Sequence, residues 1–201
     1  EYDENDYVDH TIQNIITDQF TNSDNMVKIG DCLFDSIAAI INEHTNQQLQ
    51  AIDLRNKIVA HVKQLSLDNL KLFVAAITNE NYANTQTTKI TDFSNRSHVN
   101  EQLETMILNT NYWGDTMEVQ FFYEYLQQQF NIILLVIDEE TYKLKINSHT
   151  FDEQAKYSIL AYTGNHYYNK QFQNQFIFSR TQLDFSMLEQ LIMDSNKYEK
   201  G

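Results

Sequence analysis

Residues 30–38 read Gly-Asp-Cys-Leu-Phe-Asp-Ser-Ile-Ala and mark the start of a predicted buried helix. Apolar residues at positions 33 to 41 cover much of the circumference of a helix, which is typical of a helix enclosed by other elements. Cys32 stands immediately before its first turn, where backbone N–H groups carry partial positive charge. A thiolate is stabilised there, so Cys32 is a candidate nucleophile. The N–H groups of Gly30, Asp31 and Cys32 are placed to form an oxyanion site.

His166 is the candidate base. It follows an apolar run at residues 157–162, predicted to be a strand, through a short turn at Thr163-Gly164. A thiol nucleophile activated by a histidine base is the dyad of thiol proteases. Cys32 and His166 are 166 − 32 = 134 residues apart, so only the fold can pair them. Taken singly, each has an ordinary alternative, a buried thiol for Cys32 and an exposed turn histidine for His166.

Glycine is scarce and concentrated. Three of the four glycines stand at positions 30, 114 and 164, and the fourth is the terminal residue. A chain with so little glycine is expected to place it where the backbone bends or lies close to another group. Two of these positions adjoin Cys32 and His166, and the third follows Trp113.

The periodicity of apolar residues predicts an α+β fold. Helical spacing occurs at residues 8–20, 33–41, 54–65, 99–107, 117–126 and 183–193. Strands are expected at 132–137, as a central buried strand, and at 142–146, 157–162 and 172–178, with a surface loop at 79–96. Asp115 and Glu118 form a predicted capping box before the helix at 117. Helices followed by strands favour a small mixed central sheet flanked by helices over repeated βαβ units.

Length, charge and cysteine content limit the kinds of molecule that the chain is expected to bind. The chain has 201 residues, 42% of them apolar, and a formal net charge of −14. This size suits a single domain, and no apolar run approaches the roughly 20 residues of a membrane span. An acidic surface disfavours nucleic acid and membrane partners and favours a basic protein or peptide, although the charge alternatively serves only solubility. One cysteine excludes an internal disulfide, and no cluster has metal-ligand spacing, so neither metal nor cofactor is expected.

Four segments in order resemble the OTU (ovarian tumour) family of ubiquitin-directed cysteine proteases. They are residues 30–38, the pair Leu54-Arg55, the run Trp113-Gly114-Asp115-Thr116-Met117-Glu118, and His166-Tyr167 after the strand at 132–137. The resemblance spans about residues 27–169. Two positions depart from the family pattern. Ile29 stands where the family has Asp, three residues before the cysteine, and Tyr168 stands where it has Asp or Asn, two residues after the histidine.

The resemblance implies a papain-like OTU fold and a deubiquitinase. The expected arrangement is one OTU domain over residues 1–201, with an N-terminal helical extension at 1–26 and a closing helix within 180–201. Cys32 would attack the carbonyl of the terminal glycine of ubiquitin, His166 would move the proton, and Gly30 and Asp31 would form the oxyanion loop. Trp113 and Tyr167 would line the substrate groove, although a core tryptophan is the alternative for Trp113. Ubiquitin or polyubiquitin is the expected partner of a monomeric domain that acts without a cofactor in the cytoplasm, or after delivery into a host cell if the source is a microbe.

Two questions stay open at the level of sequence. The residue that orients His166 is Asn169, if a one-residue bulge brings it into place, or otherwise Asp9, Asp24 or Asp31. The alternatives to a deubiquitinase are a thiol peptidase or acyltransferase with another substrate, and a non-catalytic ubiquitin-binding module on the same scaffold.

Overall fold

The structure is a computed structural model. It describes residues 13–14, 16–23, 30–80, 90–146, 152, 154–164 and 166–182. The chain divides into two compact units. The sheet unit comprises Glu1–Asn25, Glu43–Asn46 and Tyr123–Gly201, and the helical unit comprises Met26–Asn42 and Gln47–Phe122.

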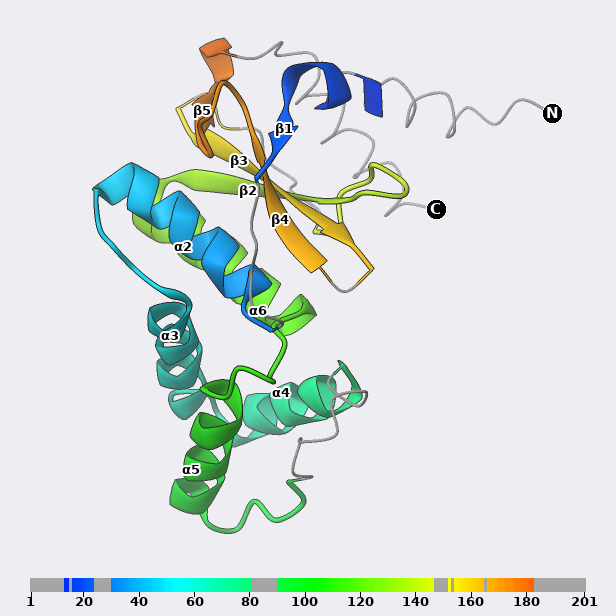
Figure 1. Cartoon of the computed structure of the whole chain (residues 1–201). Coiled ribbons are helices and arrows are strands. Elements are labelled where there is room, and N and C mark those ends of the chain that lie inside the picture. The colour runs from blue at the N-terminus through cyan, green and yellow to red at the C-terminus, as the bar shows by residue number, and fades with distance from the viewer. Residues whose placement is uncertain are drawn as a thin grey trace, which may run out of the picture. The chain divides into compact units, whose positions relative to one another are not determined.

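The sheet unit is built on a mixed β-sheet (Figure 1). Its described strands are β1 (Thr21–Asn22), β2 (Ile132–Asp138), β3 (Lys156–Thr163), β4 (His166–Gln171) and β5 (Phe178–Ser179), the last followed by a 3₁₀ turn, η1 (Arg180–Gln182). The hydrogen-bonded order is β1-β4-β3-β2, and β5 pairs with the start of β3. Strands β2 and β3 are parallel, whereas the other pairs are antiparallel. This sheet confirms the predicted α+β class.

The apolar run at residues 132–137 forms β2, all of which is buried except its last residue. The prediction of a central strand is wrong, because β2 stands at one end of the strand order within the described residues. The segment that follows covers part of its outer edge. Leu144 forms a bridge with Ile137, and the Lys145 N–H donates to the Val136 carbonyl at 2.7 Å. Residues on both faces of β2 are buried, which accounts for its continuous apolar sequence, and this cover hides part of its edge from pairing with another strand.

The helical unit contains α3 (Ala51–Lys63), α4 (Leu67–Glu80) and α5 (Arg96–Ile107), which Figure 1 shows gathered together. Two further helices, α2 (Cys32–Thr45) and α6 (Thr116–Phe130), begin in this unit and end in the sheet unit. The core of the helical unit is apolar and includes Leu33, Phe34, Ile37, Leu54, Ile58, Phe73, Leu103, Ile107 and Phe122. The helix predicted from residue 33 is α2, and its buried positions cover most of its surface as expected.

One helix was not predicted. Helix α4 buries Leu70, Phe73 and Ile77, which have helical spacing. Leu67 and Leu72 belong to the same helix but are 46% and 66% exposed. These two residues add apolar positions outside the buried stripe, so the sequence pattern does not match a single helical face.

Two predicted strands are wrong. In the segment 142–146, Tyr142 has a left-handed backbone with φ of 57°, and only Leu144 makes a β-bridge. In the segment 172–178 the chain reverses direction. Gln173 and Asn174 both have positive φ, and the flanking residues 172 and 175 exchange backbone hydrogen bonds. Two consecutive residues of positive φ are the geometry of a type I′ turn.

Several predicted elements fall partly or wholly outside the described residues. Of the helix predicted at 8–20, residues 13–14 and 16–19 are described as helical, and Ile16 and Phe20 are buried. The helix predicted at 183–193 lies outside the described residues, as does the middle of the predicted loop, residues 81–89. In the described part of the chain, no helix combines the length and apolarity that crossing a membrane requires.

Candidate active site

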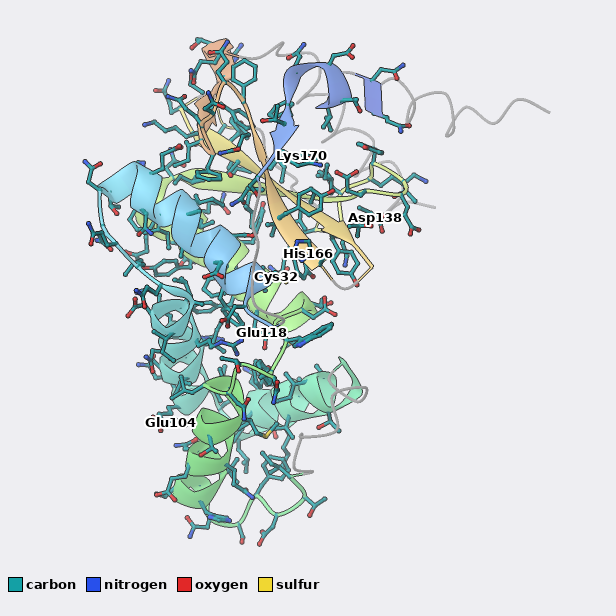
Figure 2. All side chains as sticks on the ribbon, viewed as in Figure 1. Cys32, Glu104, Glu118, Asp138, His166 and Lys170 are labelled. Carbon is teal, nitrogen blue, oxygen red and sulfur yellow. The ribbon has the colours of Figure 1, made fainter. Side chains whose placement is uncertain are left out.

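Cys32 belongs to the helical unit and is the first residue of α2 (Figure 2). It is partly exposed. At the start of the helix, the Asp31 carbonyl accepts from the Asp35 N–H at 2.8 Å and the Cys32 carbonyl accepts from the Ser36 hydroxyl at 2.7 Å. The N–H groups of this turn are at the positive end of the helix, which favours a thiolate. The predicted position of the cysteine at a helix start is confirmed.

Arg55 of α3 fixes the loop that precedes Cys32. Its side chain is 1% exposed. The guanidinium donates to the Gly30 carbonyl at 2.9 Å and to Asp31 Oδ1 from Nη2 at 2.8 Å and from Nε at 3.1 Å. It also donates to the Ile107 carbonyl at 2.7 Å and lies 4.3 Å from the centre of the Phe34 ring. The Asp31 carboxylate is therefore bound by Arg55, and we do not propose it as the partner of His166.

Gly30 adopts a backbone conformation that other residues rarely reach. Its φ is +101°, and a Cβ built on it would lie 1.9 Å from the Thr110 carbonyl oxygen and 3.1 Å from Trp113 Cδ1. The loop before the cysteine is thus packed directly on the backbone of a second loop, between α5 and α6. Glycine is required at this position, as its scarcity elsewhere suggested.

The second loop carries Trp113 and Gly114 and is itself held by Glu118. A Cβ at Gly114 would lie 2.7 Å from Leu33 Cδ2. Glu118 is 1% exposed, accepts from the Asp115 N–H at 3.0 Å and also accepts from the Tyr112 hydroxyl. The first of these bonds is the predicted capping interaction at the start of α6. Trp113 is partly exposed.

His166 belongs to the sheet unit and is the first residue of β4 (Figure 2). It pairs with Thr163 across a tight turn in which Gly164 has φ of +60°. The His166 side chain is exposed. Its ring stacks on that of Tyr168, with ring centres 5.8 Å apart and planes inclined by 22°. The histidine therefore follows the strand and turn that the sequence predicted, although β4 itself was not predicted.

The register of β4 settles which of its side chains share a face. Residues 166–170 pair one to one with residues 163–159 of β3, so the strand contains no bulge. Successive side chains alternate, which places His166 and Tyr168 on one face and Tyr167 and Asn169 on the other. Asn169 is fully buried, and its backbone exchanges hydrogen bonds with Ser23, whose hydroxyl accepts at 3.1 Å and whose N–H donates at 2.8 Å.

Two sequence predictions change as a result. The contact of Asn169 with His166 required a bulge that β4 lacks, so we no longer assign Asn169 as the orienting residue. Tyr167 was expected in a substrate groove, but it is 2% exposed and its ring packs 4.8 Å from that of Tyr162. Such a position is that of a core side chain. Asp9 and Asp24, the other candidates, lie outside the described residues.

A polar cluster surrounds the ring of Tyr168. Glu139, just after β2, accepts hydrogen bonds from the hydroxyls of Tyr168 and Tyr142 and forms an ion pair with Lys170. Burial alone would raise the pKa of Glu139, but the hydrogen bonds from Lys170, Tyr168 and Tyr142 hold that pKa below its ordinary value. Burial, and next the hydrogen bond to Glu139, raise the pKa of the Tyr168 hydroxyl far above its ordinary value. The hydroxyl therefore stays protonated and remains a donor.

The roles of Arg55 and Glu139 could not be predicted from the sequence. In the sequence Arg55 appears only as part of a Leu-Arg pair, and nothing in a single sequence shows that its charge is buried. Glu139 lies in an acidic stretch that reads as an ordinary exposed turn. Among the residues that the structure describes, no three histidine, cysteine or acidic side chains are grouped as a metal site would require.

A family model for OTU-like cysteine proteases matches residues 29–170, more than half of the chain. Among solved structures, an OTU deubiquitinase from Wolbachia pipientis wMel is similar with a TM-score of 0.50 and 18% identity, over 86% of this chain and 96% of that one. An ovarian tumour (OTU) domain in complex with ubiquitin gives a TM-score of 0.53 and 18% identity, over 88% and 84%. At this level of identity the likeness concerns the fold. No curated protein matches the chain.

Proposed function

The chain belongs to the OTU-like cysteine protease family, and from that membership we propose that it is a deubiquitinase with Cys32 as nucleophile and His166 as general base. The observation that carries the proposal is the family match over residues 29–170, which includes both residues. It is supported by the position of Cys32 at a helix N-terminus behind a loop fixed by Arg55. It is also supported by the solved structures of similar fold, two of which contain bound ubiquitin.

The proposed reaction is thiol-dependent hydrolysis. His166 takes the proton of the Cys32 thiol, and the sulfur attacks the carbonyl carbon of the last glycine of ubiquitin. The resulting oxyanion is stabilised by backbone N–H groups of the loop at Gly30 and Asp31. The C–N bond to the lysine amine breaks as His166 returns the proton to the amine. Water, deprotonated by His166, then displaces the thiolate and releases ubiquitin with a free carboxylate.

The substrate class is tested with ubiquitin that carries a C-terminal electrophile. A deubiquitinase forms a covalent adduct one ubiquitin heavier, and Cys32→Ala forms none. A non-catalytic ubiquitin-binding module would bind ubiquitin without forming the adduct. A thiol peptidase or acyltransferase with another substrate would have a reactive Cys32 toward a small alkylating reagent but would leave the ubiquitin probe unmodified. Either result would overturn the proposal.

The assignment of His166 as base is tested by turnover of di-ubiquitin. His166→Ala is expected to lower kcat by at least about 10²-fold, the scale of losing a general base. His98 on α5 is exposed and serves as the matched control. An equal loss in His98→Ala would show that His166 is not the base. Asp9→Ala and Asp24→Ala test whether a carboxylate from the N-terminal segment also orients the histidine.

A further inference from the structure

We infer that Tyr168 is the positioning residue of His166: its ring, fixed by Glu139, holds the imidazole in place by stacking. The inference rests on the proposed role of His166 as base and extends it. Tyr168 occupies the second position after the histidine, so the two side chains share one face of β4. Their rings are nearly parallel, inclined by 22° with centres 5.8 Å apart.

Stacking constrains the imidazole without engaging either nitrogen. The two ring nitrogens of histidine lie in the plane of the ring, whereas the contact with Tyr168 is made through the ring face. Both nitrogens therefore stay available, one to accept the thiol proton and the other to carry its own hydrogen. A hydrogen-bonding orienter would occupy one of them. His166 is exposed, and within the described residues Tyr168 is the aromatic ring that it contacts.

Tyr168 can act in this way because its own side chain has two further contacts, one at the hydroxyl and one over the ring. Its hydroxyl donates to the Glu139 carboxylate, and the Lys170 ammonium lies 5.3 Å from its ring centre. His166, Tyr168 and Lys170 are spaced two residues apart, so the tyrosine ring is the middle member of a row on one face of β4. Figure 2 shows the two outer members, His166 and Lys170, extending from this strand.

Glu139 in turn is anchored to the sheet. Its backbone N–H donates to the Tyr162 carbonyl of β3 at 2.8 Å, and its side chain also accepts from the Tyr142 hydroxyl at 2.9 Å. Lys170, which is ion-paired with Glu139, donates further to Asn22 Oδ1 of β1 at 2.7 Å. The ring of Tyr168 is thus tied through side chains to β1 and to the ends of β2 and β3. A network of hydrogen bonds and an ion pair of this kind restricts rotation of its members.

The test compares variants that separate the ring of Tyr168 from its hydroxyl. Tyr168→Leu removes the ring and is expected to lower kcat for di-ubiquitin by roughly 2- to 10-fold, the factor that corresponds to one aromatic pair. KM should change by less than about twofold, because the ring acts on His166 and not on ubiquitin. Tyr168→Phe keeps the ring and should lose less than Tyr168→Leu. Tyr125→Leu removes a ring of the same size from α6 of the sheet unit, where it packs on Phe130, and is the matched control.

A second readout is independent of activity. In the NMR spectrum of the intact chain, the ring protons of His166 should be shifted upfield by the ring current of Tyr168. The shift should persist in Tyr168→Phe and Tyr125→Leu and disappear in Tyr168→Leu. If Tyr168→Leu does not fold, Tyr168→Thr provides a second variant without the ring and with a high preference for strands.

Unchanged His166 signals on removal of the ring would overturn the inference, and so would an undiminished kcat. If the wild-type chain does not react with ubiquitin, the proposed substrate is wrong, but the NMR comparison still decides whether Tyr168 holds the imidazole.

Discussion

At the scale of single residues, Arg55 determines the shape of the loop before the nucleophile. Its planar guanidinium serves two backbone carbonyls and the Asp31 carboxylate while its face covers the ring of Phe34. A lysine has one donor atom and cannot satisfy these groups together. Because the side chain is 1% exposed, its charge is stabilised by these partners and not by water. The loop before Cys32 therefore keeps its shape through the Arg55 guanidinium, and the buried guanidinium is stabilised by that loop.

Removal of this guanidinium should be costly. Arg55→Ala leaves the Asp31 carboxylate and the Gly30 and Ile107 carbonyls without their partner, and we expect the free energy of unfolding to fall by about 3–5 kcal/mol. Lys63→Ala breaks an ion pair with Glu104 whose side chains are 42% and 40% exposed, and should cost less than about 1 kcal/mol. Urea unfolding of the two variants gives the comparison. Equal losses of unfolding free energy in the two variants would mean that the buried contacts of Arg55 stabilise the chain no more than an exposed ion pair does.

Two glycines with positive φ allow a matched test of backbone packing. Gly30→Ala combines strain at a φ of +101° with a Cβ only 1.9 Å from the Thr110 oxygen, so it should destabilise the chain by at least about 3 kcal/mol. Gly164→Ala has a φ of +60° and no atom within 4 Å of its Cβ, and should cost about 1 kcal/mol. Thermal or urea unfolding separates the two. A mild Gly30→Ala variant would show that the two loops are not packed as described.

At the scale of elements, the sequence predicts those whose signal is local. The capping pair Asp115 and Glu118, the apolar helix after Cys32 and the continuous run of β2 each require only neighbouring residues, and each was found. Strand β4 reads His-Tyr-Tyr-Asn-Lys-Gln and has no apolar alternation, because its buried positions include Tyr167 and Asn169. Its partners Ser23 and Glu139 are remote in sequence, so tertiary contacts rather than local pattern define it.

At the site, too, the residues that the sequence predicts are those with a local signal. Cys32 and His166 are found in short segments whose glycines and neighbours are visible in the sequence. The side chain that shares a strand face with His166 could not be predicted, because it is residue 168 in a regular strand and residue 169 only if β4 contains a one-residue bulge. A shift of one residue moves every side chain of a strand to the other face. No property of either residue alone distinguishes the two registers.

The cluster at the end of β2 predicts a specific dependence of stability on pH. The folded-state pKa of Glu139 is lowered from its ordinary value of 4.5. A carboxyl with a lowered pKa contributes stability above its unfolded-state pKa and loses that contribution as the pH falls through the folded-state pKa. Wild type should therefore be more stable than Glu139→Gln at neutral pH, and the difference should shrink below about pH 4.5. Urea unfolding at several pH values measures it.

The pKa of a second carboxyl, that of Asp35, is shifted in the opposite direction. This shift does not affect the difference in stability between wild type and Glu139→Gln. Burial, and next the Asp31 carboxylate, raise the pKa of Asp35. Asp35 is present in both wild type and Glu139→Gln and lies in a different part of the chain, so its contribution cancels in the difference. If the stability difference grew as the pH fell, Glu139 would not be held ionised by its three donors.

At the scale of the whole molecule, the dominant property is charge. The chain has 14 basic and 28 acidic residues. Such an excess attracts a positively charged partner over distances set by the Debye length, which is about 10 Å at 0.1 M salt. The proposed substrate presents arginines near the end of its tail, so attraction of this tail should raise the rate of encounter. The charge would then serve recognition as well as solubility.

Attraction between the acidic chain and a basic tail predicts that turnover depends on salt. When the ionic strength is raised from about 0.02 M to about 0.3 M, kcat/KM for di-ubiquitin should fall by up to about tenfold, because screening weakens long-range attraction before it affects bound groups. The value of kcat should stay nearly constant, since the chemical step occurs after binding. Alkylation of Cys32 by a small uncharged reagent is the control and should be insensitive to salt. If kcat/KM were constant or rose with salt, the acidic residues would lie away from the face that meets the substrate, and the net charge would act on solubility alone.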